Sequence, residues 1–197
     1  MRGAFEAMLD ELADELGGEV KVFRQHRDIR FSADKSPYKT RTYGVIHDRP
    51  GAAPTVYAQV SATGLYAASG YYMLASDQLE RFRAAIADDA TGPVLEQAVA
   101  AAQAAGIETY GETLKTAPRG YPRDHPRIGL LRHKSLIGGA RLAPRARGIA
   151  RKAALDHLRG TWAACEPLCA WLDAHVGPSE LPPPDDRFGR GRRRARR

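Results

Sequence analysis

The region from residue 40 to residue 73 constrains the fold most, because strand-like segments alternate there with turn residues. Each segment is rich in the β-branched and aromatic residues that favour strands, and short gaps containing Gly, Pro or Asp separate them. Strands are predicted at residues 40–47, 55–62 and 65–73. Neighbouring strands joined by short turns pair as antiparallel hairpins. An antiparallel sheet is therefore expected at the centre of the molecule.

Apolar residues recur at helical spacing on both sides of this region. Helices are predicted at residues 3–16, 77–87, 93–105, 127–133 and 153–176. Residues 20–31 add a first strand and residues 107–110 a short one, while Pro167 predicts a kink or a split in the last helix. We predict one α+β domain over residues 3–176, with an antiparallel sheet of four to five strands, helices packed on one side and a long C-terminal helix.

The net charge of +7 is concentrated at the C-terminus. Residues 185–197 contain seven arginines and two aspartates, so they carry five of the seven net charges. The Pro/Arg-rich composition of residues 177–197 predicts a disordered tail. No apolar run approaches the roughly 18 residues of a membrane span, and the first residues lack a signal-peptide pattern. We expect a cytoplasmic protein without a membrane partner.

Residues 23–39 form the first candidate site, because many charged side chains gather in one short segment. Its cations are Arg24, Arg27, Arg30, Lys35 and Lys39. At a period of two, Arg27 falls on the apolar face of the predicted strand, where an unpaired charge costs several kcal/mol. Asp28 points to the opposite face, so Asp34 or a more distant carboxylate is expected to pair with Arg27.

A second polar cluster lies in the irregular segment 111–134. If this segment folds over the open face of the sheet, cations from both clusters converge on one anion, for which arginine is well suited. The predicted ligand-binding residues are Arg24, Arg30, Lys35, Lys39, Lys115, Arg119 and His125. We therefore expect a basic pocket that binds a small ligand bearing a phosphate or a carboxylate group.

Three alternatives stand beside this hypothesis. In a structural interpretation, ion pairs among Arg27, Asp28 and Asp34 lock the turn, and similar pairs pin the long segment to the sheet. In an enzymatic interpretation, His125 transfers protons with Asp28 or Asp34 as its partner on a phosphorylated or carboxylated metabolite. In a nucleic-acid interpretation, the arginine-rich tail binds through counterion release.

Several familiar chemistries lack their sequence patterns. The chain has neither a phosphate-cradling Gly-rich loop nor a Gly-x-Ser-x-Gly nucleophile elbow. The histidines show no paired metal-ligand spacing, so we expect no metal and no cofactor. Cys165 and Cys169 are four residues apart on a predicted helix, which favours packed thiols. Gly70 inside a predicted strand indicates either a bulge or close backbone approach, or a twist in an ordinary sheet.

The two polar clusters also carry a resemblance to a known family. The matching motifs are Phe23-Arg24, Arg27-Asp28, Arg30-Phe31-Ser32, Asp34-Lys35, Pro37-Tyr38-Lys39, Gly70-Tyr71-Tyr72, Gly111, Leu114-Lys115, Pro118-Arg119-Gly120, Asp124-His125-Pro126, Leu131 and Lys134-Ser135. In these motifs the chain resembles an uncharacterised microbial family, domain of unknown function 2461, over most of residues 20–137. The resemblance implies a compact α+β domain and leaves its biochemical activity open.

The chain departs from the family pattern in two places. Family members usually carry a Trp-Phe pair before the first helix, so we expect either a start assigned too late or an N-terminally shortened copy. They also usually carry aromatic and acidic residues after the Lys-Ser motif, whereas residues 140–151 are rich in Ala and Arg. A disturbed reading frame and genuine divergence both account for that second difference.

Overall fold

The computed structural model describes residues 2–24, 39–49, 55–145 and 148–182. Its elements are α1 (Arg2–Leu16), β1 (Glu19–Val22), β2 (Arg41–His47), β3 (Val56–Ser61), β4 (Gly64–Tyr71), α2 (Ser76–Ala87), α3 (Gly92–Ala104), β5 (Glu108–Tyr110), α4 (Ile128–Leu131), β6 (Leu136–Leu142) and α5 (Arg151–His175). The predicted α+β class is confirmed, and most elements lie where their sequence patterns place them.

The strands form one antiparallel sheet in the order β1-β2-β3-β4-β6-β5. These six described strands exceed the four to five that we predicted, because β6 was missed. Its sequence, Leu-Ile-Gly-Gly-Ala-Arg-Leu, has two adjacent glycines in the middle and so lacks a clear strand pattern. β6 nevertheless pairs with β4 on one side and with β5 on the other. Ala140, Arg141 and Leu142, which begin the divergent segment, complete this strand in register.

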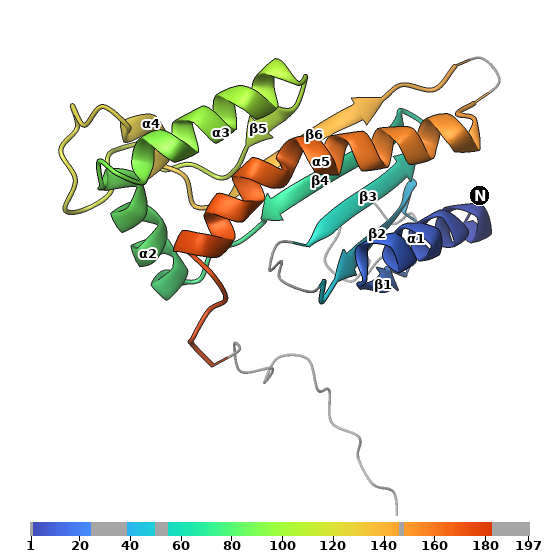
Figure 1. Ribbon diagram of the computed structural model, residues 1–197, viewed down its shortest axis with the longest axis horizontal. Coiled ribbons are helices and arrows are strands. Elements are labelled where there is room, and N and C mark those ends of the chain that lie inside the picture. Colours follow the sequence, from blue (N-terminus) through green and yellow to red (C-terminus); the bar gives the residue numbers. More distant parts are fainter. Residues whose placement is uncertain (1, 25–38, 50–54, 146–147, 183–197) are drawn as a thin grey trace, which may run out of the picture.

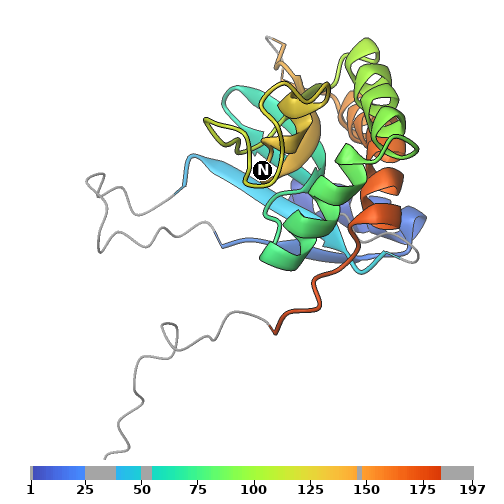
Figure 2. The ribbon, with the colours of Figure 1, turned by 90° about the vertical axis from the view of Figure 1, so that its left-hand side faces the viewer.

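The helices cover one face of the sheet, as predicted. Figure 1 shows α5 crossing β4 and β6, with α1 beside it over β1 and β2. Viewed from the end that carries α2 and α4, Figure 2 shows α3 and α5 on the same side of the sheet. Three core clusters result among the described residues, and α5 contributes to all of them: Leu158 and Trp162 to the first, Leu168 and Trp171 to the second, and its two cysteines to the smallest. Full burial of each such large apolar side chain contributes about 1.5–3 kcal/mol.

Helix α5 runs through Pro167 without interruption, so the predicted split is not observed. Buried residues lie on both sides of the proline, including Cys165, Leu168 and Cys169. Packing along this stripe holds the helix together, although proline removes one backbone hydrogen bond. Both thiols are free and buried, and burial raises the pKa of Cys165 to about 11 and that of Cys169 to about 12.

The glycine inside β4 marks a close approach of two backbones. Gly70 pairs with Ile137 of β6 at a φ of 132°, a value that side-chain-bearing residues rarely adopt. A Cβ atom placed there would lie 2.3 Å from the carbonyl oxygen of Leu136. Of the two interpretations of Gly70, close approach is therefore the correct one. Within the described ranges, no helix combines the length and the apolar character needed to span a membrane.

The substitution Gly70→Ala tests this approach. We expect it to lower the free energy of unfolding by about 2 kcal/mol, since it adds backbone strain and a clash at once. The matched control is Gly160→Ala in α5, where an added Cβ meets nothing within 4 Å. That change should stabilise the protein by about 0.4–1 kcal/mol. Chemical denaturation measures both variants, and equal stability of the two would contradict the β4–β6 geometry.

Candidate functional site

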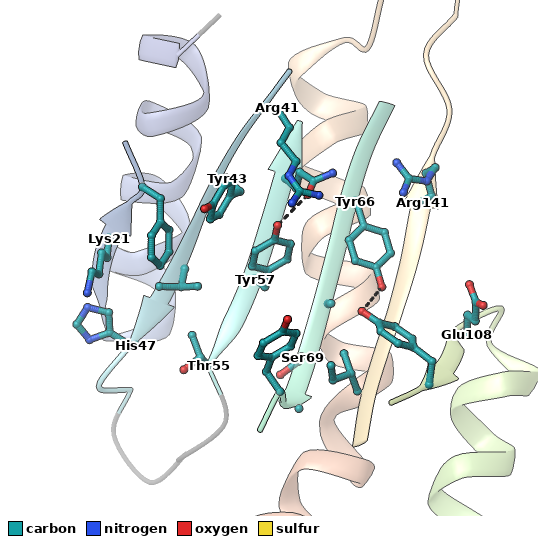
Figure 3. Close-up of a pocket in the computed structure, with 18 residues that line it drawn as sticks. Lys21, Arg41, Tyr43, His47, Thr55, Tyr57, Tyr66, Ser69, Glu108 and Arg141 are labelled. Carbon is teal, nitrogen blue, oxygen red and sulfur yellow. Dashed lines mark hydrogen bonds between the residues drawn. The ribbon is translucent and has the colours of Figure 1, made fainter. Parts of the chain in front are cut away.

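The helices determine which side chains remain on the outer side of the sheet, because side chains alternate between the two faces of a strand. In β2, Gly44 and Ile46 face the helices, where Gly44 lies against Leu9 and Ile46 is completely buried. Tyr43 and Val45 take the opposite side. We call this side, opposite α1 and α5, the open face. In Figure 3 its side chains stand in front of the strands, with helices behind.

The open face is hollowed. The hollow has a volume of about 1010 Å³, the upper end of the range typical for small-molecule sites. It is lined by Lys21, Phe23, Arg41, Tyr43, Val45, His47, Thr55, Tyr57, Gln59, Tyr66, Ala68, Ser69, Gly70, Tyr72, Glu108, Tyr110, Ile137 and Arg141. All six strands, or the residues directly beside them, contribute to this lining. It is therefore a property of the whole sheet, and sequence segments far apart in the chain supply it.

Five aromatic residues form a continuous row across the open face, which we call the aromatic row: Phe23, Tyr43, Tyr57, Tyr66 and Tyr110. The rings of Phe23 and Tyr43 are stacked with centroids 4.9 Å apart. Tyr43 and Tyr57 follow at 6.0 Å, and Tyr57 and Tyr66 at 6.4 Å with an edge-on arrangement. The Tyr66 hydroxyl then donates to the Tyr110 hydroxyl over 2.7 Å (Figure 3). The row thus runs from the outer side of β1 to β5.

A small residue beneath Tyr66 makes room for this contact. A Cβ atom at Gly139 of β6 would lie 2.2 Å from the Tyr66 hydroxyl oxygen, so the ring reaches Tyr110 only across a glycine. Burial, together with the hydrogen bond to Tyr110, raises the pKa of Tyr66 well above its usual range. Burial likewise raises the pKa of Tyr57 to about 12. Both phenols are therefore neutral at physiological pH and act as hydrogen-bonding and stacking groups.

Cations lie against these rings at several points. The Lys39 ammonium lies 4.6 Å from the centroid of Tyr43 and donates to its hydroxyl over 2.6 Å. The Arg41 guanidinium lies 5.7 Å from the same ring, and that of Arg141 lies 5.3 Å from Tyr66. The Lys21 ammonium lies 5.6 Å from the ring of Phe23. Among the described lining residues, the one carboxylate is that of Glu108. The hollow is therefore basic as well as aromatic.

The predicted ligand-binding residues of the first cluster are only partly described. Lys39 lies beside Tyr43 at the open face, and Arg24 is exposed next to Phe23. Arg30 and Lys35 lie outside the described residues. The same holds for the predicted ion-pair residues Arg27, Asp28 and Asp34 and for the arginines of the tail. The partners proposed for these side chains stay predictions.

The second cluster does not line the hollow. Lys115 and Arg119 are exposed in the loop between β5 and α4, and His125 is half-buried there, accepting a hydrogen bond from the backbone N–H of Arg127. The loop is held to the helices by Arg127, whose side chain is only 7% exposed. Its guanidinium donates to the carbonyls of Ile86 and Ala87 over 2.6 and 3.0 Å, near the end of α2. The second cluster thus belongs to a loop that Arg127 attaches to α2.

One group of side chains at the edge of the open face has metal-ligand character. Ligand atoms of Glu19, His47 and Asp48 all lie within 4.8 Å of one another. Within this group, the Nδ1 atom of His47 lies 2.7 Å from a carboxylate oxygen of Asp48. Two of the three groups thus already contact each other, and the expectation that the protein binds no metal stays a prediction.

The aromatic row was missed at the sequence level, although part of its signal was visible. Tyr43, Tyr57 and Tyr66 stand at positions of the same parity as other outward residues of their strands. A period-two reading of the three central strands would have placed these tyrosines on one face. Tyr110 carries no such signal, because its strand is only three residues long.

Comparison with known proteins identifies a family and nothing more specific. A family model described as "Conserved hypothetical protein (DUF2461)" matches residues 2–171. No curated protein matches the chain. No solved structure matches it either.

Arg127 offers a test of the structural role of the second cluster. We expect Arg127→Lys to lower the free energy of unfolding by about 2 kcal/mol, since one ammonium cannot reach the carbonyls that the guanidinium joins. Arg119→Lys in the same loop is the matched control, and its exposure predicts a change below about 0.5 kcal/mol. Thermal unfolding at neutral pH compares them. If Arg127→Lys is as stable as the control, the loop is held by other contacts.

The contact between Tyr66 and Tyr110 gives a second prediction. Tyr110→Phe removes the hydroxyl that accepts from Tyr66, so we expect a loss of about 1 kcal/mol in the free energy of unfolding. The control Tyr72→Phe changes a side chain that is 77% exposed and should leave stability unchanged. Urea unfolding separates the two, and an unaltered midpoint for Tyr110→Phe would speak against the hydrogen bond.

Proposed function

This chain belongs to the DUF2461 family of conserved hypothetical proteins, and we propose that it binds a small anionic ligand on the open face of its sheet. The ligand carries a phosphate or carboxylate group, and a planar ring that stacks on the aromatic row. The observation that carries the proposal is the pairing of rings and cations within one hollow of about 1010 Å³.

The rings and the cations have complementary tasks in such a site. Aromatic pairs contribute about 0.5–1.5 kcal/mol beyond the burial of their area, which favours a ligand with a flat ring. Arg41 and Arg141 bring planar guanidinium groups, which suit bidentate contacts with phosphate or carboxylate oxygens. Gln59, whose Oε1 accepts from the Tyr57 hydroxyl over 2.9 Å, adds a polar group to the lining of the hollow.

Binding is better supported than catalysis. The polar groups that line the hollow are mainly phenols, guanidinium groups and an amide, which suit recognition, and the histidine among them, His47, lies at the edge of the open face with its ring against Asp48. His125, the residue proposed for proton transfer, lies in the loop before α4, outside this lining, and its partner Asp28 lies outside the described residues. The cations that support the proposal also differ from most of those predicted, since Arg41 and Arg141 take the place of the loop residues.

A thermal-shift screen of the full-length protein tests the proposal. The panel contains phosphorylated and carboxylated metabolites, each with and without a planar ring. Anions that carry a ring should raise the melting temperature by about 5–10 °C at a hundredfold excess over Kd, because a ligand that binds only the native state stabilises it by mass action. Anions without a ring should have a smaller effect.

Variants of the cations locate the site. Arg41→Gln and Arg141→Gln should each weaken binding about tenfold or more, since each removes a charge-assisted hydrogen bond. Lys152→Gln is the matched control, because its side chain is 88% exposed on α5 and pairs with Asp156. Equal shifts in all three variants would reject the open face as the binding site, as would a panel without any stabilising anion.

A further inference from the structure

The aromatic row extends beyond the reach of one small ligand. Neighbouring strands lie about 4.8 Å apart, so the four steps from β1 to β6 span about 19 Å. The cations lie at both ends of this distance: Lys21 is against Phe23 beside β1, while Arg141 projects from β6 against Tyr66. Lys39 and Arg41 lie next to Tyr43, between these ends. A single phosphate or carboxylate cannot contact both ends, whereas a chain of regularly spaced anions can.

We propose that the ligand of the open face is a single-stranded nucleic acid. The inference rests on the proposed function, in which the open face recognises an anion that carries a ring, and it extends that ligand from one such unit to a chain of them. Bases offer a flat ring at every repeat and phosphates offer a charge at every repeat, which matches a row of rings accompanied by cations. Stacking on aromatic side chains is open to every base, so this face predicts binding with little sequence preference.

The geometry favours a single strand over a duplex. In a duplex the base faces are stacked on each other and hidden, so the rings of the aromatic row would have no partner. In Figures 1 and 3 the helices pack on one side of the sheet, and the side chains that line the hollow project from the other. Sheets with exposed aromatic residues bind unpaired bases in this way, whereas readers of duplex DNA insert a helix or a two-stranded ribbon into a groove.

The carboxylate of Glu108 defines one end of the bound strand. It lies on β5 at the far edge of the sheet, beside Tyr110 and beyond Arg141. A phosphate placed there would meet a like charge, so the bound nucleic acid should end or turn away between Tyr66 and Tyr110. The backbone of the ligand therefore runs along the cations from Lys21 to Arg141.

Fluorescence anisotropy with the full-length protein tests this inference. The probes are a labelled oligothymidylate of about eight nucleotides, a duplex of the same length, and thymidine monophosphate as an unlabelled competitor. We expect the single strand to bind at least about tenfold more tightly than the mononucleotide and than the duplex, because several rings act together. The arginine-rich tail is present throughout, so differences among variants isolate the open face.

Three variants connect the affinity to named side chains. Tyr57→Leu should weaken binding of the single-stranded oligothymidylate about tenfold, because it removes a ring on which a base stacks. Arg141→Gln should weaken it and lower the slope of log K against log salt by about 0.7, the value for one phosphate contact on a single strand. Lys152→Gln should change neither quantity. Melting curves of each variant verify the fold, and the exposed Arg141 keeps the test valid if Tyr57→Leu fails to fold.

The outcomes separate the two proposals. If the mononucleotide binds as tightly as the strand and both are weakened by Arg141→Gln, the open face binds a small anion and the inference is overturned. If the oligothymidylate binds all variants with equal affinity, or if the duplex binds as tightly as the oligothymidylate, the inference also fails. If neither thymidine monophosphate nor the oligothymidylate binds, and no metabolite of the panel raises the melting temperature, both the inference and the proposed function are rejected.

Discussion

Burial of one face of the sheet under α1 and α5 determines what the other face presents. The apolar side chains of β2, β3 and β4 that point toward these helices form the largest core cluster with Phe5, Leu9, Leu158 and Trp162. Because the strands have a side-chain period of two, a shift of one residue would exchange the two faces completely. The burial of this core therefore also fixes the register that aligns Tyr43, Tyr57 and Tyr66. Stability and the candidate site depend on the same alternation.

Much of the fold follows from local patterns. The hairpins of residues 40–71 and the helices α1, α2 and α3 were predicted within a few residues, since their periodicity is regular and turn residues separate them. β6 was missed because its interior contains Gly138 and Gly139, which weaken any strand signal. It is a strand because it pairs with β4 and β5, and local sequence patterns do not predict pairing between distant segments.

The site was harder to predict than the fold. Charged residues draw attention in a sequence, so the prediction relied on the cations of residues 23–39 and 111–134. In the loop, however, the important guanidinium is that of Arg127, which binds the end of α2. The aromatic row depends on contacts between strands that are distant in sequence, such as that between Tyr66 and Tyr110. Such contacts require the strand order, which local periodicity does not supply.

The empty position above Gly139 has a consequence for comparisons among relatives. A methyl group there would push the phenol of residue 66 off the strand, and the link to the last ring would break even with every tyrosine in place. Retention of the tyrosines in a homologue is thus insufficient evidence that it shares this surface. The residue to inspect first is the one that aligns with Gly139, because only a glycine there leaves space for the Tyr66 ring.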